Sequence, residues 1–393
     1  MSKQHILAIP FPAQGHVIPL MELSQCLANL GFEVTFVNTE HNHKRVMNAL
    51  ADESHISRDH IHLVSIPDGL EPLEDRNELG RLSEAMQRVM PGKLEELIEK
   101  INQGEGQKIT CVIADQTAGW ILEVAEKMKI RRVAFCPAAA AVLALILSIP
   151  KLIHEGIINN DEPAAFTLAP EILPIGPLLA SNRLENSAGY FWPQDLTCLN
   201  WLDQQPPCSV IYVAFGSFTV LDQTQFQELA LALELSQMPF LWVVRPDTTE
   251  KTCNLYPEGY QDRVASRGLM VGWAPQQKVL AHPSIACFLS HCGWNSTIEG
   301  LTNGVPFLCW PYFADQFLNE SYISDVWKVG LKFNKNENGI ITQGEIKNKL
   351  EQLLGDENFK ARASKLKELA ITSVKEGGQS NKTFKNFIEW IKS

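Results

Sequence analysis

Short apolar runs alternate with longer amphipathic stretches in the first part of the chain. The runs are β-rich and read HILAIP, EVTFVN, IHLVSIP, CVIAD and RRVAFCP. Between the first two runs, Leu20, Leu23, Leu27 and Leu30 recur at helical spacing. The stretches LSEAMQRVMPGKLEELIEKI and WILEVAEKMKI are also helical. Because strands and helices alternate, the pattern predicts βαβ units and a parallel sheet.

A second series of the same kind begins near residue 200. Its runs are SVIYVAFGS, PFLWVVRP, GLMVGWAP, IACFLSHCG and VPFLCWP, and helical patterns separate them. We therefore expect an α/β fold with two doubly wound domains, 1–180 and 199–375, that face a central cleft. Residues 181–198 are polar and turn-rich and form the linker between them. A C-terminal helix, 376–393, is expected to pack back on the N-terminal domain.

The longest apolar stretch, AAAAVLALILSIP at 138–150, predicts a buried helix because a membrane span needs roughly 20 residues. Gln14 and His16 interrupt the apolar run near the N-terminus, which is a poor signal peptide. Nine cysteines at irregular spacings indicate buried thiols in a reducing compartment. A cytoplasmic monomer without an integral membrane segment is the resulting expectation. The net charge of -11 argues against a nucleic-acid partner.

The turn LSHCGWNSTIEG is the densest in polar and small residues. Ligands of open α/β sheets bind beyond the carboxyl ends of the strands, so this turn is a candidate site. A strand is expected to end at His291 and a helix to start near Asn295 or Ser296, which makes an anion site of the helix start. The alternative is structural, because Ser296 and Glu299 have the spacing of a capping box.

This turn lies within the block WAPQQKVLAHPSIACFLSHCGWNSTIEGLTNGVPFLCWPYFADQ, from Trp273 to Gln316. The block closely resembles the signature box of plant secondary-metabolite UDP-glycosyltransferases. The resemblance implies a GT-B fold of two Rossmann-like domains. It also implies UDP-glucose as donor and transfer of glucose, with inversion, to a hydroxyl of a lipophilic small molecule such as a phenolic, flavonoid, terpenoid or steroid. UDP-glucose would be a co-substrate, with no resident cofactor.

The resemblance implies a role for each position of the box. Trp273 would stack on uracil, the backbone of Ala274 would read the uracil edge, and Gln276 would line that pocket. Glu299 would accept hydrogen bonds from the ribose hydroxyls. The diphosphate would be held by His291, Asn295, Ser296 and, from the FGS turn, Ser217. The sugar would be surrounded by Trp294, Asp315 and Gln316.

Each of these residues has a structural alternative. Trp273 and Trp294 could be core aromatics, Asp315 could be a helix N-terminal carboxylate, and Ser217 could be an ordinary turn residue. Only the joint pattern favours the donor site over these alternatives.

The turn FPAQGHVIPL follows the first predicted strand and ends in His16 at a helix start. If HILAIP and CVIAD are neighbouring strands at the switch point of the sheet, His16 and Asp115 face the same crevice. Burial and the helix N-terminus both favour a neutral imidazole, which can accept a proton, and Asp115 would fix its tautomer. The alternative is that both residues cap local structure. The resemblance implies that His16 is the catalytic base and Asp115 its partner.

The chain departs from the resemblance near Glu162 and Pro163, where the family usually has several tens of residues more. This difference leaves a second function open: a protein that binds UDP-sugar but does not transfer it, because the acceptor domain is incomplete. A dinucleotide-dependent oxidoreductase is disfavoured, since the first turn lacks the three-glycine fingerprint. No metal site is expected, because Asp-x-Asp is absent and the pairs His41/His43 and His60/His62 have no evident third ligand.

Overall fold

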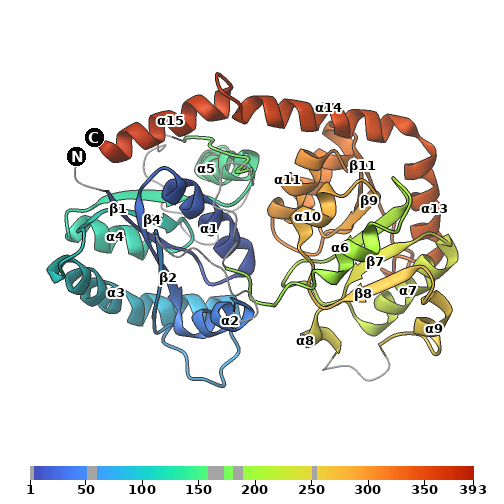
Figure 1. Ribbon diagram of the computed structural model, residues 1–393, viewed down its shortest axis with the longest axis horizontal. Coiled ribbons are helices and arrows are strands. Elements are labelled where there is room, and N and C mark those ends of the chain that lie inside the picture. Colours follow the sequence, from blue (N-terminus) through green and yellow to red (C-terminus); the bar gives the residue numbers. More distant parts are fainter. Residues whose placement is uncertain (1–3, 51–59, 158–171, 180–188, 250–254) are drawn as a thin grey trace. The chain divides into compact units, whose positions relative to one another are not determined.

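The computed structural model describes residues 4–50, 60–157, 172–179, 189–249 and 255–393. By their contacts, the residues group into two compact units. The first comprises Met1–Pro137, Leu173–Pro193 and Lys382–Ser393, and the second comprises Ala138–Ile172 and Gln194–Asn381. Each unit is built around one parallel sheet (Figure 1).

The first unit contains a five-stranded parallel sheet in the order β3-β2-β1-β4-β5. The strands are β1 (His5–Ile9), β2 (Glu33–Thr39), β3 (Ile61–Ile66), β4 (Ile109–Asp115) and β5 (Arg131–Phe135). All five coincide with predicted runs. The order reverses between β1 and β4, whose pairing includes Ile9 opposite Ala114. The expected switch point is therefore confirmed.

Alternating side chains of β1 enter two separate cores on the two faces of this sheet. Ile6 and Ala8 pack in a cluster with α1 (Gln14–Asn29), whereas Leu7 and Ile9 pack with α3 (Leu79–Gln103) and α4 (Trp120–Lys127). Strands that are buried on both faces are typical of doubly wound sheets. Helix α2 (Glu40–Leu50) follows β2.

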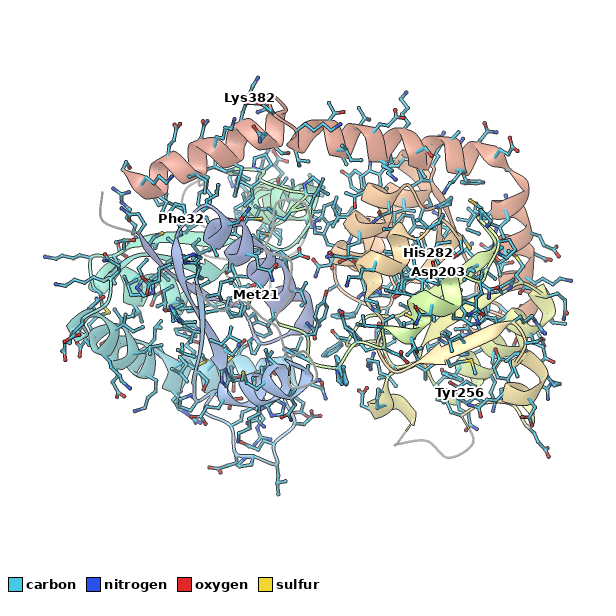
Figure 2. The ribbon with its side chains drawn as sticks, viewed as in Figure 1. Met21, Phe32, Asp203, Tyr256, His282 and Lys382 are labelled. Atoms are coloured by element: carbon cyan, nitrogen blue, oxygen red, sulfur yellow. The ribbon has the colours of Figure 1, made fainter. Side chains whose placement is uncertain are left out.

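The C-terminal helix α15 (Gln379–Lys392) contributes Phe387, Ile388 and Ile391 to the core that contains α1. Met21 and Phe32, labelled in Figure 2, belong to the same cluster. Arg131 donates to the carbonyl of Trp390 at 2.6 Å, which places a cation at the negative end of the helix.

Helix α5 (Ala140–His154) corrects the expectation of a buried helix in the stretch 138–150. None of its residues is buried, and Leu145 is 50% exposed. By its contacts, α5 groups with the second unit, whereas the predicted boundaries place it in the first domain. Length and apolar composition predicted the helix, but its burial depends on neighbours that composition does not specify. The proposed join at Glu162 and Pro163 lies outside the described residues.

The second unit contains a six-stranded parallel sheet in the order β11-β10-β9-β6-β7-β8. Its strands are β6 (Val210–Ala214), β7 (Phe240–Val243), β8 (Gly268–Val271), β9 (Ile285–Ser290), β10 (Phe307–Cys309) and β11 (Gly330–Lys332). The first five coincide with predicted runs, and β11 was not predicted. The switch point lies between β6 and β9, where Ala214 pairs with Ser290.

Helices cover both faces of this second sheet. They are α6 (Thr197–Leu202), α7 (Gln223–Ser236), α8 (Pro246–Thr249), α9 (Tyr260–Val264), α10 (Gln276–Ala281), α11 (Trp294–Asn303), α12 (Gln316–Ser321), a π-helical turn (Tyr322–Val326), α13 (Gln343–Gly355) and α14 (Glu357–Val374). His282, just after α10, approaches Asp203 after α6 with Nε2 and Oδ1 3.1 Å apart (Figure 2). Among the described helices, none combines the length and the apolar character that a membrane span requires.

Candidate functional site

His16 and Asp115 meet at the switch point of the first sheet. His16 is the third residue of α1, directly after β1, and Asp115 is the last residue of β4. The imidazole Nδ1 lies 2.7 Å from the carboxylate Oδ2 of Asp115. The histidine side chain is 30% exposed, whereas the aspartate side chain is fully buried. The predicted pairing is therefore present, and its histidine is half-buried at the surface of the unit.

The electrostatics of Asp115 favour its ionised form. Burial alone would raise the pKa of Asp115, but hydrogen bonds from His16 and Thr117 outweigh burial and lower it. Thr117 donates to Oδ1 with its backbone N–H, at 2.9 Å, and with its hydroxyl, at 2.6 Å. Because the carboxylate only accepts hydrogen bonds, Nδ1 of His16 carries the proton and Nε2 keeps its lone pair. This arrangement gives His16 the tautomer of a general base.

Gln14 begins the helix that carries His16, and the sequence pattern assigns it no role in the site. Its side chain is buried and forms two hydrogen bonds with one backbone segment. Its Nε2 donates to the carbonyl of Gly189 at 3.0 Å, and its Oε1 accepts from the N–H of Phe191 at 2.7 Å. This amide fixes the start of α1 to the segment that leaves the first unit.

In the second unit, the predicted donor residues lie in the turns that follow strands or in the helices that begin there. The turn 215–219 follows β6, Trp273 follows β8, His291 follows β9, and Asp315 comes after β10. Strand β9 ends at Ser290, one residue before the predicted end, and α11 begins at Trp294. The start of α11 is therefore beside the switch point, where its free N–H groups can bind an anion.

The imidazole of His291 fills the space between two glycines. A Cβ atom placed on Gly216 would lie 2.6 Å from Nε2 of His291, and one placed on Gly293 would lie 2.5 Å from it. Burial lowers the pKa of His291 to about 4; a hydrogen bond with the Ala214 backbone opposes this shift, and the positive charge of Arg245 adds to it. His291 is therefore neutral near pH 7 and can present one N–H donor, not two.

The capping-box alternative for Ser296 and Glu299 is wrong. The N-cap of α11 is Gly293, and Ser296 is the third residue inside the helix. Gln276 donates from Nε2 to the Ser296 hydroxyl at 2.9 Å and to Oε2 of Glu299 at 2.7 Å. Gln277 donates to the other oxygen, Oε1, at 3.0 Å. Gln276, Glu299 and Ser296, which belong to the predicted uracil, ribose and diphosphate subsites, are thus joined by direct hydrogen bonds.

Trp273 and Ala274 form the turn that leads into α10. Trp273 is partly buried against the core of the unit, and its carbonyl accepts from the N–H of Asp195 at 2.8 Å. The carbonyl of Ala274 accepts from the N–H of Gln276 at 2.8 Å. Trp273 and Trp294 are both partly buried, so each leaves part of its surface exposed.

Asp315 and Gln316 lie at the start of α12, but their side chains make different contacts. Oε1 of Gln316 accepts from the N–H groups of Tyr312 and Phe313, at 2.7 and 3.1 Å, so this oxygen closes the local turn. Asp315 is the N-cap residue, as the structural alternative expected, but its Oδ2 accepts from the side-chain amide of Asn319 at 2.9 Å.

Two residues that shape the donor turns were not found from the sequence. Arg245, which follows β7, is 5% exposed and donates from Nη1 to the carbonyls of Gly216, at 2.8 Å, and Thr219, at 2.9 Å. It therefore holds both sides of the turn that carries Ser217. The hydroxyl of Tyr212 donates to Oε1 of Gln276 at 3.1 Å. The sequence shows only an arginine at the end of the run PFLWVVRP, and neither its burial nor the carbonyls that it contacts could be predicted from that position.

Within the described residues, no group of three or more histidine, cysteine, aspartate or glutamate side chains could hold a metal ion. His62 instead approaches Glu33, at 3.7 Å, and burial lowers the pKa of His41 and of His43. These histidines therefore carry no argument for a metal centre.

Two family profiles match consecutive parts of the chain. The profile described as "Glycosyltransferase, N-terminal domain" matches residues 3–167, and "UDP-glucoronosyl and UDP-glucosyl transferase" matches residues 193–372. UDP-glycosyltransferase 83A1 of Arabidopsis thaliana is 43% identical over all of this chain and 98% of its own length. The chain belongs to the plant UDP-glycosyltransferases. It is therefore a hexosyltransferase of the GT-B fold whose relatives act on small molecules.

Solved structures of UDP-glycosyltransferases match nearly the whole chain. Os79 from O. sativa, in complex with UDP, has a TM-score of 0.82 and 25% identity, and the match covers 98% of this chain and 100% of Os79. UDP-glucose: anthocyanidin 3-O-glucosyltransferase, in complex with UDP, has a TM-score of 0.79 and 26% identity over 100% of this chain and 99% of that chain. These complexes support binding of a UDP-sugar donor by this UDP-glycosyltransferase.

This UDP-glycosyltransferase is shorter than its relative from Arabidopsis thaliana. Their alignment extends over 464 positions, whereas the chain has 393 residues. The alignment therefore contains positions at which this chain has no residue, in agreement with the shortening noted in the sequence.

Proposed function

We propose that this UDP-glycosyltransferase uses UDP-glucose and transfers glucose, with inversion, to a hydroxyl of a lipophilic small molecule. The observation that carries the proposal is the 2.7 Å hydrogen bond between His16 and the buried Asp115. This pair forms a base whose free nitrogen, Nε2, lies on a half-exposed side chain.

The reaction is a single displacement at the anomeric carbon. Nε2 of His16 takes the proton of the acceptor hydroxyl while its oxygen bonds to the anomeric carbon from one face. The bond from that carbon to the UDP oxygen breaks on the opposite face, and UDP leaves with the electron pair. General-base assistance of this kind contributes roughly 10²–10⁴-fold to the rate. Asp115 stabilises the imidazolium that forms.

The leaving UDP is stabilised by the start of α11. The N–H groups there, with Asn295, Ser296 and Ser217, would meet the charge that develops on the diphosphate, and preorganised donors often supply the larger share of catalysis. His291 would add one neutral donor. The scheme requires neither a metal nor a resident cofactor.

The nucleoside would bind between Trp273 and the amide–carboxylate cluster of Gln276 and Glu299. Trp273 would stack on uracil, the backbone of Ala274 would read its edge, and Glu299 would accept from the ribose hydroxyls. The Glu299 carboxylate also accepts from the side-chain amides of Gln276 and Gln277. Trp294, Asp315 and Gln316 would surround the sugar. Glucose is favoured because a solved relative is named as a UDP-glucose-dependent glucosyltransferase.

The test is an acceptor panel with UDP-glucose as donor. The purified protein is incubated with phenolic, flavonoid, terpenoid and steroid alcohols, and intact-mass analysis detects an added hexose. Transfer to at least one acceptor is expected, and the product of an α-configured donor should be a β-glucoside by NMR. His16→Ala should abolish most of the transfer while UDP affinity is retained. Wild-type transfer by this variant would show that His16 is not the base.

The alternative, a protein that binds UDP-sugar without transfer, is not favoured because the chain aligns with complete transferases over its whole length. The same panel separates the two functions. UDP binding by calorimetry with no hexose added to any acceptor, from any UDP-sugar, would support the binder. A cytoplasmic location and a monomeric state remain expectations, checked by cell fractionation and by light scattering.

A further inference from the structure

Asn319 is a buried amide in α12 that lies beyond the end of the signature box. It is 1% exposed, and its backbone N–H bonds to the carbonyl of Asp315 at 3.0 Å in the first turn of the helix. No role follows for it from the sequence pattern. Its side chain, however, contacts two turns of the donor half.

The amide nitrogen Nδ2 of Asn319 donates both of its hydrogens. One goes to the carbonyl of Cys292, at 2.9 Å, and the other to Oδ2 of Asp315, also at 2.9 Å. Cys292 lies between His291 and Gly293 in the proposed diphosphate turn. One side chain therefore joins the diphosphate turn to the carboxylate proposed to hold the sugar.

Both turns need such support because each contains a non-glycine residue with positive φ. Cys292 has φ of 62°, and Ala314, directly before Asp315, has φ of 55°. L-residues adopt this region reluctantly, so surrounding contacts must hold them there. Asn319 donates one hydrogen bond to the carbonyl of Cys292 and one to the side chain of Asp315, which directly follows Ala314.

We propose that Asn319 is a positioning residue for the glycosyl donor, which fixes the Asp315 carboxylate relative to the diphosphate turn. This role rests on the proposed binding of a UDP-sugar with Asp315 at its hydroxyls. Oδ1 of Asn319 is buried and has no hydrogen-bond partner within the described residues. The amide is therefore held through its nitrogen alone, and a carboxylate in its place would face Asp315 with like charge.

The first experiment compares affinities for UDP and UDP-glucose by calorimetry. Asn319→Ala removes both hydrogen bonds, and Asn319→Asp keeps the shape but repels Asp315. Because the proposed role of Asp315 is to hold the sugar and not UDP, the ratio of the Kd for UDP-glucose to the Kd for UDP should rise roughly tenfold in both variants. That factor is the effect of losing a hydrogen bond to a charged group. A purely structural role would weaken both ligands equally, and that result would overturn the proposal.

Gln225 supplies a matched control in the same unit. It is also a buried amide with two backbone hydrogen bonds, to the carbonyl of Ile341 at 2.7 Å and from its N–H at 3.0 Å. Gln225→Glu should lower the melting temperature without changing the ratio of the two Kd values. A changed ratio in this control would show that the ratio reports general destabilisation, which would also overturn the assignment.

A double-mutant cycle tests whether Asn319 acts through Asp315. Asp315→Ala should raise the Kd ratio, and adding Asn319→Ala should raise it no further, because the group that Asn319 positions is already absent. Additive effects would refute this route. If the wild type transfers a sugar other than glucose, the assignment of glucose as the donor sugar is wrong. The role of Asn319 is then tested by the ratio of the Kd for that UDP-sugar to the Kd for UDP.

Discussion

Replacement of Asp115 by asparagine isolates the electrostatic contribution of the buried carboxylate to the proposed base. The wild-type carboxylate is fully buried and accepts three hydrogen bonds, one from His16 and two from Thr117. The asparagine side chain has nearly the same volume. The amide oxygen can still accept from Thr117. The amide nitrogen then faces Nδ1 of His16, which favours the tautomer with the proton on Nε2. That tautomer cannot accept a proton from the acceptor.

The expected loss follows from the contact that disappears. A hydrogen bond to a charged group contributes about 1.5–3 kcal/mol, and each 1.4 kcal/mol is a factor of ten. Loss of the carboxylate should therefore lower kcat by about 10²-fold. UDP affinity should not change, because Asp115 belongs to the first unit and the donor turns to the second. Thr117→Val, which removes one donor from Oδ1 and leaves His16 paired, is the control and should cost much less.

The assay is kcat for glucose transfer at saturating UDP-glucose, measured by mass spectrometry from pH 6 to 9. The pKa of Asp115 is lowered in the folded state, because its hydrogen bonds outweigh burial. The stability it contributes is thus present above the ordinary carboxyl pKa and is lost only as the pH falls through the lower folded value. Titration of Asp115 cannot therefore cause a rate difference in this range. An Asp115→Asn variant with kcat within twofold of wild type would refute the pairing as the source of basicity.

Three further predictions concern the donor half. Arg245→Met leaves the carbonyls of Gly216 and Thr219 without their donor, which costs about 1–3 kcal/mol for each carbonyl. Calorimetry should show UDP affinity reduced at least tenfold. Unchanged affinity would mean that the turn that carries Ser217 keeps its conformation without Arg245. Glu299→Ala should abolish the preference for UDP over 2′-deoxy-UDP, and a preserved preference would assign Glu299 only to its bonds with neighbouring amides. His291 has a pKa of about 4 when folded and 6.5 as its ordinary value, so the unfolded chain binds the proton first and stability falls as pH drops between these values. Urea unfolding should show about 2 kcal/mol lost from this source between pH 7 and pH 5, and His291→Asn should remove that part of the difference.

The strand order and the His16–Asp115 pair could be predicted because topology constrains them. Alternating strands and helices place the first and fourth strands side by side, so their carboxyl ends must be neighbours. Strand β11 (Gly330–Lys332) was missed because Lys328 and Lys332 interrupt the apolar residues around it, whereas the equally short β10 lies within the apolar run VPFLCWP. Helix α5 was predicted as a helix but not as an exposed one, since burial is a property of its neighbours.

The roles of residues that donate to backbone carbonyls could not be predicted from the sequence. Arg245 and Asn319 donate to the carbonyls of Gly216 and Cys292, and carbonyls carry no residue-specific pattern. At Ser296, by contrast, the sequence suggested a role that the structure does not show. The spacing of Ser296 to Glu299 fits a capping box, but the helix begins two residues before Ser296. Spacing alone could not decide, because both side chains find partners in Gln276.

The two glycines around His291 differ in how freely they could change during evolution. Gly293 has φ of -59° and ψ of 145°, which any residue adopts, so only the imidazole excludes a side chain there. Gly216 has φ of 67° and is constrained by its own backbone as well. His291→Ala should therefore restore folding to Gly293→Ala but not to Gly216→Ala. A smaller residue at position 291 would therefore allow a side chain at position 293. It would not allow one at position 216, where the positive φ still favours glycine.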